Sequence, residues 1–182
     1  MEFKTALEYQ NVEEILDLWK EIRKEILLNI EATPEDMFFV RTIENKWSVG
    51  ELAEHLYLTQ LNVVKMLKPV LRKKIGSDIG PQPELEYQKI LEGLMRPSGV
   101  QNPPSVSPKQ NFQKNEIMIL LQETESNLSK NLEGLNKDEL QKRGFEHPIF
   151  GNLNLLNWVW VMALHEYSHL ISLKEKTKQF KN

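Results

Sequence analysis

Hydrophobic residues recur at steps of three and four along four stretches of the chain, and this spacing is typical of amphipathic helices. The stretches cover about residues 11–30, 48–74, 112–135 and 154–178. No stretch alternates between apolar and polar positions, and the chain contains no internal repeat. We therefore predict an all-α four-helix bundle, with residues 1–182 forming a single domain.

Several residues mark the ends of these helices. Ser48 and Glu51 have the spacing of a capping box, in which each side chain accepts a hydrogen bond from the other residue's backbone amide. Asn154 is the best candidate to cap the last helix. A short helix is expected to begin at Asn136, and Gly144 suits the left-handed residue that follows such a helix.

Residues 76–110 separate the second and third long helices and are rich in Pro, Gly, Ser, Gln and Asn. A short helix over about residues 84–94 is expected within them, because unstructured connections of this length are uncommon. This long crossing implies that the second and third long helices need not be antiparallel neighbours.

Composition excludes several classes of function. A formal charge of -3 and a pI near 5.9 give no electrostatic reason to expect nucleic acid or an anionic membrane as a partner. The chain has no cysteine, so any metal must be held by His, Asp or Glu. It begins without a signal-peptide pattern, and the apolar run at 153–164 is too short to span a bilayer, so a cytoplasmic location is expected.

Three of the four histidines fall on apolar helix faces. His165 and His169 are one turn apart and project from one face of the last helix, while His55 lies on the core side of the second helix. One such histidine is more often a satisfied core residue than a metal ligand. Burying three imidazoles without partners is costly, whereas a shared cation gives each a role. We therefore predict that His55, His165 and His169 hold a divalent metal.

Three neutral imidazoles leave at least one coordination position for water or substrate, which is the arrangement of catalytic zinc. Zinc is therefore the first choice of metal, although nickel, manganese and ferrous iron also accept imidazole. A metal here would lower the pKa of a bound water or thiol and supply a nucleophile near neutral pH.

The run from His165 to His169 also matches the H-E-x-x-H signature of zinc metalloproteases, in which Glu166 would be the general base. Those enzymes usually take a third ligand downstream, and only Glu175 is acidic in the thirteen residues after His169, none of which is His or Asp. Glu166 is therefore a weak catalytic candidate, and a carboxylate on the surface or between helices is an equal interpretation. His147 is expected to hydrogen-bond the backbone of its own loop.

Two stretches resemble the DinB-like superfamily, which includes YfiT-type metal-dependent hydrolases and thiol-dependent transferases. They are residues 47–56, Trp-Ser-Val-Gly-Glu-Leu-Ala-Glu-His-Leu, and residues 147–154, His-Pro-Ile-Phe-Gly-Asn-Leu-Asn, which lead into the two last histidines. The resemblance covers most of the chain, and the proline-rich connection is longer than is usual for the family.

The resemblance implies a four-helix bundle with a metal on His55, His165 and His169, and a homodimer formed through a helical face. It also implies a small-molecule substrate and S-transfer from a thiol such as bacillithiol, mycothiol or glutathione, ahead of hydrolysis. Ser168 and Ser172 stand where members often carry basic or amide side chains, a difference that concerns the substrate more than the metal. The alternative is a non-catalytic metal-binding protein that serves as a sensor or interaction module.

Overall fold

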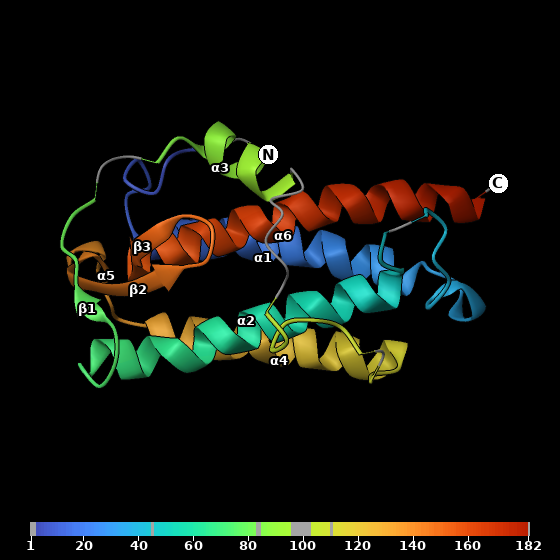
Figure 1. Cartoon of the computed structure of the whole chain (residues 1–182), viewed down its shortest axis with the longest axis horizontal. Coiled ribbons are helices and arrows are strands. Elements are labelled where there is room, and N and C mark those ends of the chain that lie inside the picture. Colours follow the sequence, from blue (N-terminus) through green and yellow to red (C-terminus); the bar gives the residue numbers. More distant parts are fainter. Residues whose placement is uncertain (1–2, 45, 83–84, 96–102, 110, 182) are drawn as a thin grey trace.

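The computed structural model describes all residues except 1–2, 45, 83–84, 96–102, 110 and 182. Four long helices lie side by side in this described part, as Figure 1 shows. They are α1 (Val12–Glu31), α2 (Val49–Leu71), α4 (Lys114–Leu132) and α6 (Leu155–Lys178). The shorter helices are η1 (Glu35–Met37), α3 (Tyr87–Met95), α5 (Lys137–Lys142) and η2 (Gln179–Lys181). The predicted all-α four-helix bundle is confirmed.

The predicted caps fix where α2 and α6 begin. Ser48 donates its backbone amide to Glu51 Oε2 at 2.8 Å, and the Glu51 amide donates to Ser48 Oγ at 3.2 Å, which completes the capping box. Asn154 Oδ1 accepts from the amide of Asn157 at 3.0 Å. The caps therefore fix the first residues of the two helices, and the helical spacing of the residues sets which of them share a face.

The four long helices run as two parallel pairs (Figure 1). The α1 and α6 helices run in one direction, and Thr177 near the end of α6 donates a hydrogen bond to Asn29 near the end of α1. The α2 and α4 helices run in the opposite direction and pack against each other. The connection between α2 and α4 must therefore return along the bundle, and its short helix α3 packs on α6. The second and third long helices are parallel neighbours, as the long crossing permits.

A small antiparallel sheet at one end of the bundle was not expected from the sequence. Its described strands are β1 (Ser77–Asp78), β2 (Arg143–His147) and β3 (Gly151–Asn154), in that order across the sheet. Strands of two to five residues are too short to show an alternating pattern.

The prediction for Gly144 is wrong, because this residue pairs with Ser77 and Asn154 inside β2 instead of ending α5 in a left-handed conformation. A Cβ atom at Gly144 would lie 1.8 Å from the carbonyl oxygen of Leu153. Glycine is therefore required here by the close approach of β3.

One buried arginine joins all four long helices at the centre of the bundle. Arg23 of α1 donates from Nε to Glu166 Oε2 of α6 at 3.0 Å, and from Nη2 to Gln60 Oε1 of α2 at 3.0 Å. Its Nη1 donates to the carbonyl oxygen of Leu121 in α4 at 3.2 Å. The Arg23 side chain is 0% exposed and forms an ion pair with Glu166, so the apolar core is built around one charged crosslink.

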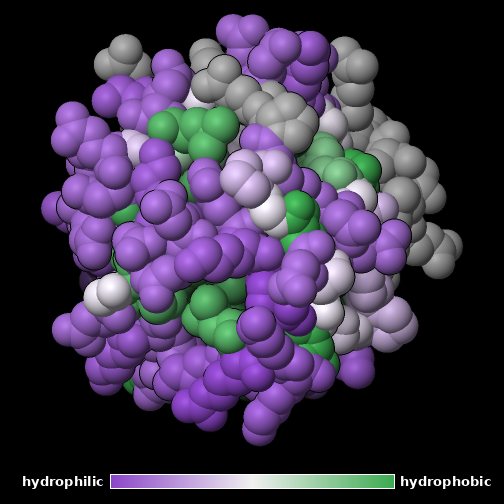
Figure 2. Space-filling view, turned by 90° about the vertical axis from the view of Figure 1, so that its left-hand side faces the viewer, coloured by the Kyte–Doolittle hydropathy of each residue, from purple (hydrophilic) through white to green (hydrophobic). Residues whose placement is uncertain are grey.

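Polar residues cover most of the sheet end of the bundle, with small apolar patches between them (Figure 2). None of the helices in the described part combines the length and apolar character that a membrane crossing requires.

Candidate metal centre

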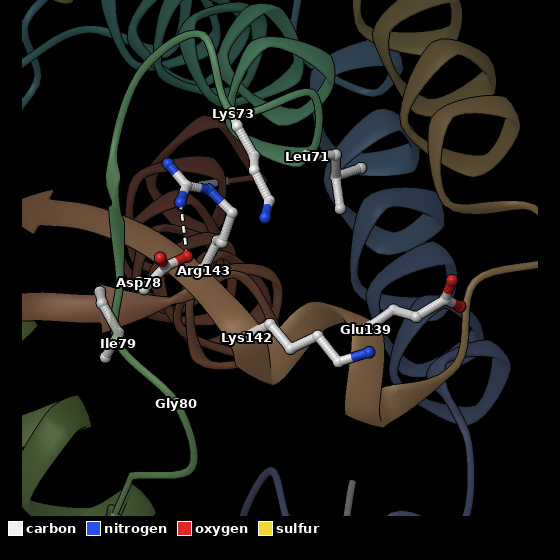
Figure 3. Close-up of a pocket in the computed structure, with 8 residues that line it drawn as sticks. All are labelled: Leu71, Lys73, Asp78, Ile79, Gly80, Glu139, Lys142 and Arg143. Carbon is white, nitrogen blue, oxygen red and sulfur yellow. Dashed lines mark hydrogen bonds and ion pairs between the residues drawn. The ribbon is translucent and has the colours of Figure 1, made fainter.

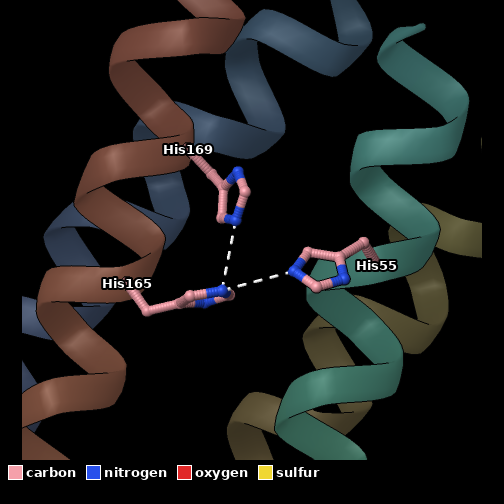
Figure 4. A group of neighbouring side chains, drawn as sticks. All are labelled: His55, His165 and His169. Carbon is pink, nitrogen blue, oxygen red and sulfur yellow. Dashed lines mark hydrogen bonds between the residues drawn. The ribbon is translucent and has the colours of Figure 1, made fainter. Parts of the chain in front are cut away.

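The structure brings His55, His165 and His169 together between α2 and α6 (Figure 4). His55 Nε2 lies 3.3 Å from His165 Nε2, and His165 Nε2 lies 3.1 Å from His169 Nε2. Their closest ring nitrogens all lie within 4.8 Å of one another. The α2 and α6 helices run antiparallel and pack against each other. Their contact brings together residues that are 110 positions apart in the sequence.

The carbonyl of Val106 sets the tautomer of His55. His55 Nδ1 lies 2.8 Å from the carbonyl oxygen of Val106, which can only accept a hydrogen bond. The proton of the neutral ring must therefore be on Nδ1, which leaves the lone pair of Nε2 directed at the other two histidines. A hydrogen bond of this kind is the usual way in which a metal-binding imidazole is oriented.

The geometry fits a cation better than a set of hydrogen bonds. His165 Nε2 faces two other ring nitrogens at hydrogen-bond distance. With three neutral rings, a proton on His165 Nε2 can point at only one of its two neighbours. A proton on His169 Nε2 instead leaves the lone pairs of His165 Nε2 and His55 Nε2 facing each other. Tetrahedral zinc with bonds of about 2.0–2.1 Å places its ligand atoms roughly 3.3–3.4 Å apart. The observed separations of 3.1 and 3.3 Å are close to that value, and the third pair, His55 and His169, lies within 4.8 Å.

All three rings are held neutral, as metal ligation requires. Loss of solvent lowers the pKa of His169 to about 3, with smaller contributions from His55 and Lys176. The pKa of His165 falls well below its usual value for the same reason, and His169 and His55 lower it further. Desolvation also lowers the pKa of His55, although the hydrogen bond to Val106 opposes this shift. The three lone pairs are therefore available near neutral pH.

The indole of Trp47 and a small cavity both border the three histidines. The indole of Trp47, just before α2, lies 4.7 Å from the His55 ring and stacks at 6.4 Å on the His169 ring, measured between centroids. A cavity of about 230 Å³ lies beside His55 and His165, and Val106 and Trp158 also line it. A molecule in this cavity would be in reach of His55 and His165.

His147 is not part of the cluster, although it lines the same cavity. Its Nδ1 accepts hydrogen bonds from the amides of Ile149 and Phe150 at 3.1 and 3.3 Å, which confirms the predicted contact with its own loop. Loss of solvent lowers the pKa of His147 to about 4. The ring is therefore neutral at physiological pH and helps to shape the turn between β2 and β3.

Glu166 lies on another face of α6 from the two histidines. Its carboxylate is 2% exposed and paired with Arg23, so it is the carboxylate between helices that the sequence offered as the second interpretation. Both carboxylate oxygens contact Arg23 and not the histidines, so this geometry does not support the metalloprotease role.

Three further residues of the site were not identified as such from the sequence. Val106 acts through its carbonyl group, which every residue has, so no sequence signal marks it. Thr59 lies one turn after His55 on the same helix face, and this spacing could have identified it. Trp158 stacks on Phe145 and also lines the cavity.

A second and larger cleft, of about 540 Å³, lies at the sheet end of the bundle (Figure 3). Lys73 and Lys142 reach into it, while Arg143 pairs with Asp78. This cleft is separate from the three histidines, because Leu71 at its edge lies 16 residues beyond His55, which is roughly 24 Å along α2. Arg143 also donates to the carbonyl groups of Val70, Ile75 and Gly76, so its main role is to fasten β2 to the end of α2.

A sequence model of the DinB superfamily matches residues 18–173, a range that contains all three histidines. The chain belongs to the DinB superfamily. Among curated proteins, the uncharacterized protein YuaE of Bacillus subtilis (strain 168) is 21% identical over 165 residues, which span 88% of this chain and 95% of that protein.

Among solved structures, YfiT from Bacillus subtilis aligns with a TM-score of 0.65 and 16% identity, over 93% of this chain and 87% of that chain. YfiT is described as a probable metal-dependent hydrolase with an unusual four-helix bundle topology. At this identity the likeness establishes the shared fold, and it confirms the bundle predicted from the hydrophobic pattern.

Proposed function

We propose that the chain is a metal-dependent enzyme that acts on a small molecule, with a divalent metal held by His55, His165 and His169. One observation carries this proposal: three neutral ring nitrogens converge within 4.8 Å of one another beside a cavity. The description of YfiT as a probable metal-dependent hydrolase agrees with it. Zinc is the first candidate, because the donors are imidazoles that leave a position open.

The residues of the chain prepare the centre for chemistry in three ways. Val106 fixes His55 in the tautomer that binds a metal, and Trp47 packs at a tilt against the ring of His55 and stacks on the ring of His169. The cavity leaves a position beside His165 where an electrophile would sit. When bound, the metal would lower the pKa of a coordinated thiol or water and so supply the nucleophile. A low-molecular-weight thiol is our first candidate and water is the second.

Elemental analysis of the purified full-length chain tests the metal assignment. We expect about one divalent metal per chain, which is lost in His55→Ala, His165→Ala and His169→Ala. His147→Ala is the matched control, because it removes a histidine from the same cavity and should keep the metal. Metal retained in the His55 variant would refute the three-histidine site.

Turnover distinguishes the three interpretations. The chain is incubated with bacillithiol or glutathione and a neutral aromatic electrophile, and separately with aryl esters in the absence of thiol. Thiol conjugation lost with the metal supports the transferase, and ester cleavage without thiol supports the hydrolase. Stoichiometric metal with no turnover above that of the free ion would support a sensor or interaction module.

A further inference from the structure

We infer that the cavity beside the three histidines takes the uncharged, largely apolar body of a substrate that carries one hydrogen-bonding group for Thr59. This inference rests on the proposed function, since it names the class of molecule on which that centre would act. It concerns residues that hold no metal, and it is therefore testable apart from the metal.

The size of the cavity limits the substrate to a small molecule. Its volume is about 230 Å³. An engineered apolar cavity of about 150 Å³ is large enough to bind benzene, whereas drug-sized ligands use roughly 300–1,000 Å³. A ring with one or two short substituents therefore matches the space.

The walls of the cavity carry no formal charge among the described residues. Apolar side chains line most of it, including Val63, Met66, Phe145 and Met162. The polar members are amide, hydroxyl or imidazole groups, and no Asp, Glu, Lys or Arg is among the described lining residues. Away from the metal, a charged group in this space would lose its hydration without gaining a partner among the described lining residues, which is strongly unfavourable.

This lack of charge also indicates which of the two substrates of a thiol transferase would bind in the cavity. Glutathione carries two carboxylates and an ammonium group, which would find no counter-charge among the described lining residues. Such a thiol would approach the metal from outside the cavity, and the apolar electrophile would occupy the cavity.

Thr59 supplies the polar contact that a bound molecule can use. It lies one turn after His55 on α2 and lines the cavity. Its Oγ1 has no hydrogen-bond partner in the described part of the chain, and because this atom is covered, the side chain must turn about χ1 for a bound molecule to reach it. An unpaired buried hydroxyl is unfavourable, so a molecule that pairs with it gains over one that does not.

The test uses three probes of similar size: para-cresol, toluene and para-toluate. Each is titrated into the full-length chain, as purified and again after dialysis against a chelator, while the indole signal of Trp158 is followed by NMR. After chelation we expect para-toluate to bind at least tenfold more weakly than para-cresol. Equal affinities for these two probes would overturn the inference.

Thr59→Val tests the hydroxyl without changing the shape of the side chain. We expect this variant to bind para-cresol about three- to tenfold more weakly and toluene as before, since one hydrogen bond contributes about 0.5–1.5 kcal/mol. An unchanged ratio of the two affinities, or an equal loss for both probes, would overturn the role of Thr59.

Thr177→Val is the matched control. Its hydroxyl donates to Asn29 Oδ1 at 3.1 Å, and Thr177 is not among the residues that line the cavity. We expect this variant to have a lower melting temperature with unchanged probe affinities. Probe selectivity in a chain that never holds stoichiometric metal would refute the proposed function and leave the ligand class of the cavity established.

Discussion

The imidazole of His55 donates a hydrogen bond from Nδ1 to the carbonyl oxygen of Val106 at 2.8 Å, which links α2 to the proline-rich connection. The preceding residue strengthens this link. The Glu54 carboxylate, which is 2% exposed, accepts from the amides of Lys109 and Asn111 at 3.0 and 3.3 Å. Two successive residues of α2 therefore hold this part of the connection against the histidines, so it belongs to the site.

Glu54→Gln should weaken metal binding without removing a ligand. The amide keeps only part of the hydrogen bonding to Lys109 and Asn111, so the carbonyl of Val106 is held less firmly against His55. Loss of such an orienting contact typically costs roughly 10- to 100-fold in metal affinity, and we expect about tenfold. A competition titration with a chromogenic chelator measures the change.

Glu123→Gln makes the same substitution at an exposed position of α4 and serves as the control. Hydrogen exchange at the amides of Lys109 and Asn111 reports whether the connection has loosened. Faster exchange with unchanged metal affinity would show that the connection does not orient His55.

Arg23→Met should destabilise the bundle strongly, because it leaves the Glu166 carboxylate buried without its partner. Breaking a buried pair in this way costs about 3–5 kcal/mol in the free energy of unfolding. Replacing both residues, as in Arg23→Met with Glu166→Leu, should recover most of that loss, since an apolar pair needs no partner. Chemical denaturation measures both variants.

The same double variant tests Glu166 as a catalytic base. We expect it to keep its metal and any activity of the wild type, because the carboxylate faces Arg23 and not the histidines. Activity abolished in a variant that folds and binds metal normally would restore Glu166 as a catalytic residue.

The metal-free chain should lose stability as the pH falls below about 6.5. The folded-state pKa values of His147 and His169 are lowered to about 4 and 3, so the unfolded chain binds more protons than the folded chain below 6.5. Each proton bound only by the unfolded chain lowers the free energy of unfolding by up to about 1.4 kcal/mol per pH unit.

Denaturant unfolding between pH 7 and pH 4 measures this dependence. His147→Gln should reduce the slope by about one proton in that range, because glutamine does not titrate. An identical slope in the variant would mean that His147 is protonated as readily in the folded chain as in the unfolded one.

Gly144→Ala should destabilise the sheet more than Gly151→Ala does. At Gly144 the new methyl group would overlap the carbonyl of Leu153, and relieving such a clash typically costs about 1–3 kcal/mol or more. At Gly151 the added atom meets nothing within 4 Å, so the only cost is the positive φ of 69°, about 1 kcal/mol. Thermal unfolding measures the melting temperature of both variants, one of which introduces a steric clash and the other a strained backbone conformation. Equal decreases in melting temperature would contradict the tight pairing of β2 with β3.

The sequence by itself determined the features that depend on neighbouring residues. The spacing of apolar positions defined four helices, and the capping residues Ser48 and Asn154 set where two of them begin. The four-residue spacing places His165 and His169 on one face of α6, and the register with apolar residues places His55 on the core side of α2. Local periodicity was sufficient for this, because a helix repeats every 3.6 residues regardless of what packs against it.

Only the tertiary structure decided how these faces meet and what surrounds them. The Val106 carbonyl reaches His55 through a connection with no periodic pattern, and Arg23 lies 143 residues from Glu166. The short strands around Gly144 form because β3 folds back on β2 as a hairpin and β1 pairs with the other edge of β2. The orientation of His55, the role of Glu166 and the cavity all depend on contacts between distant parts of the chain, which local sequence patterns do not encode.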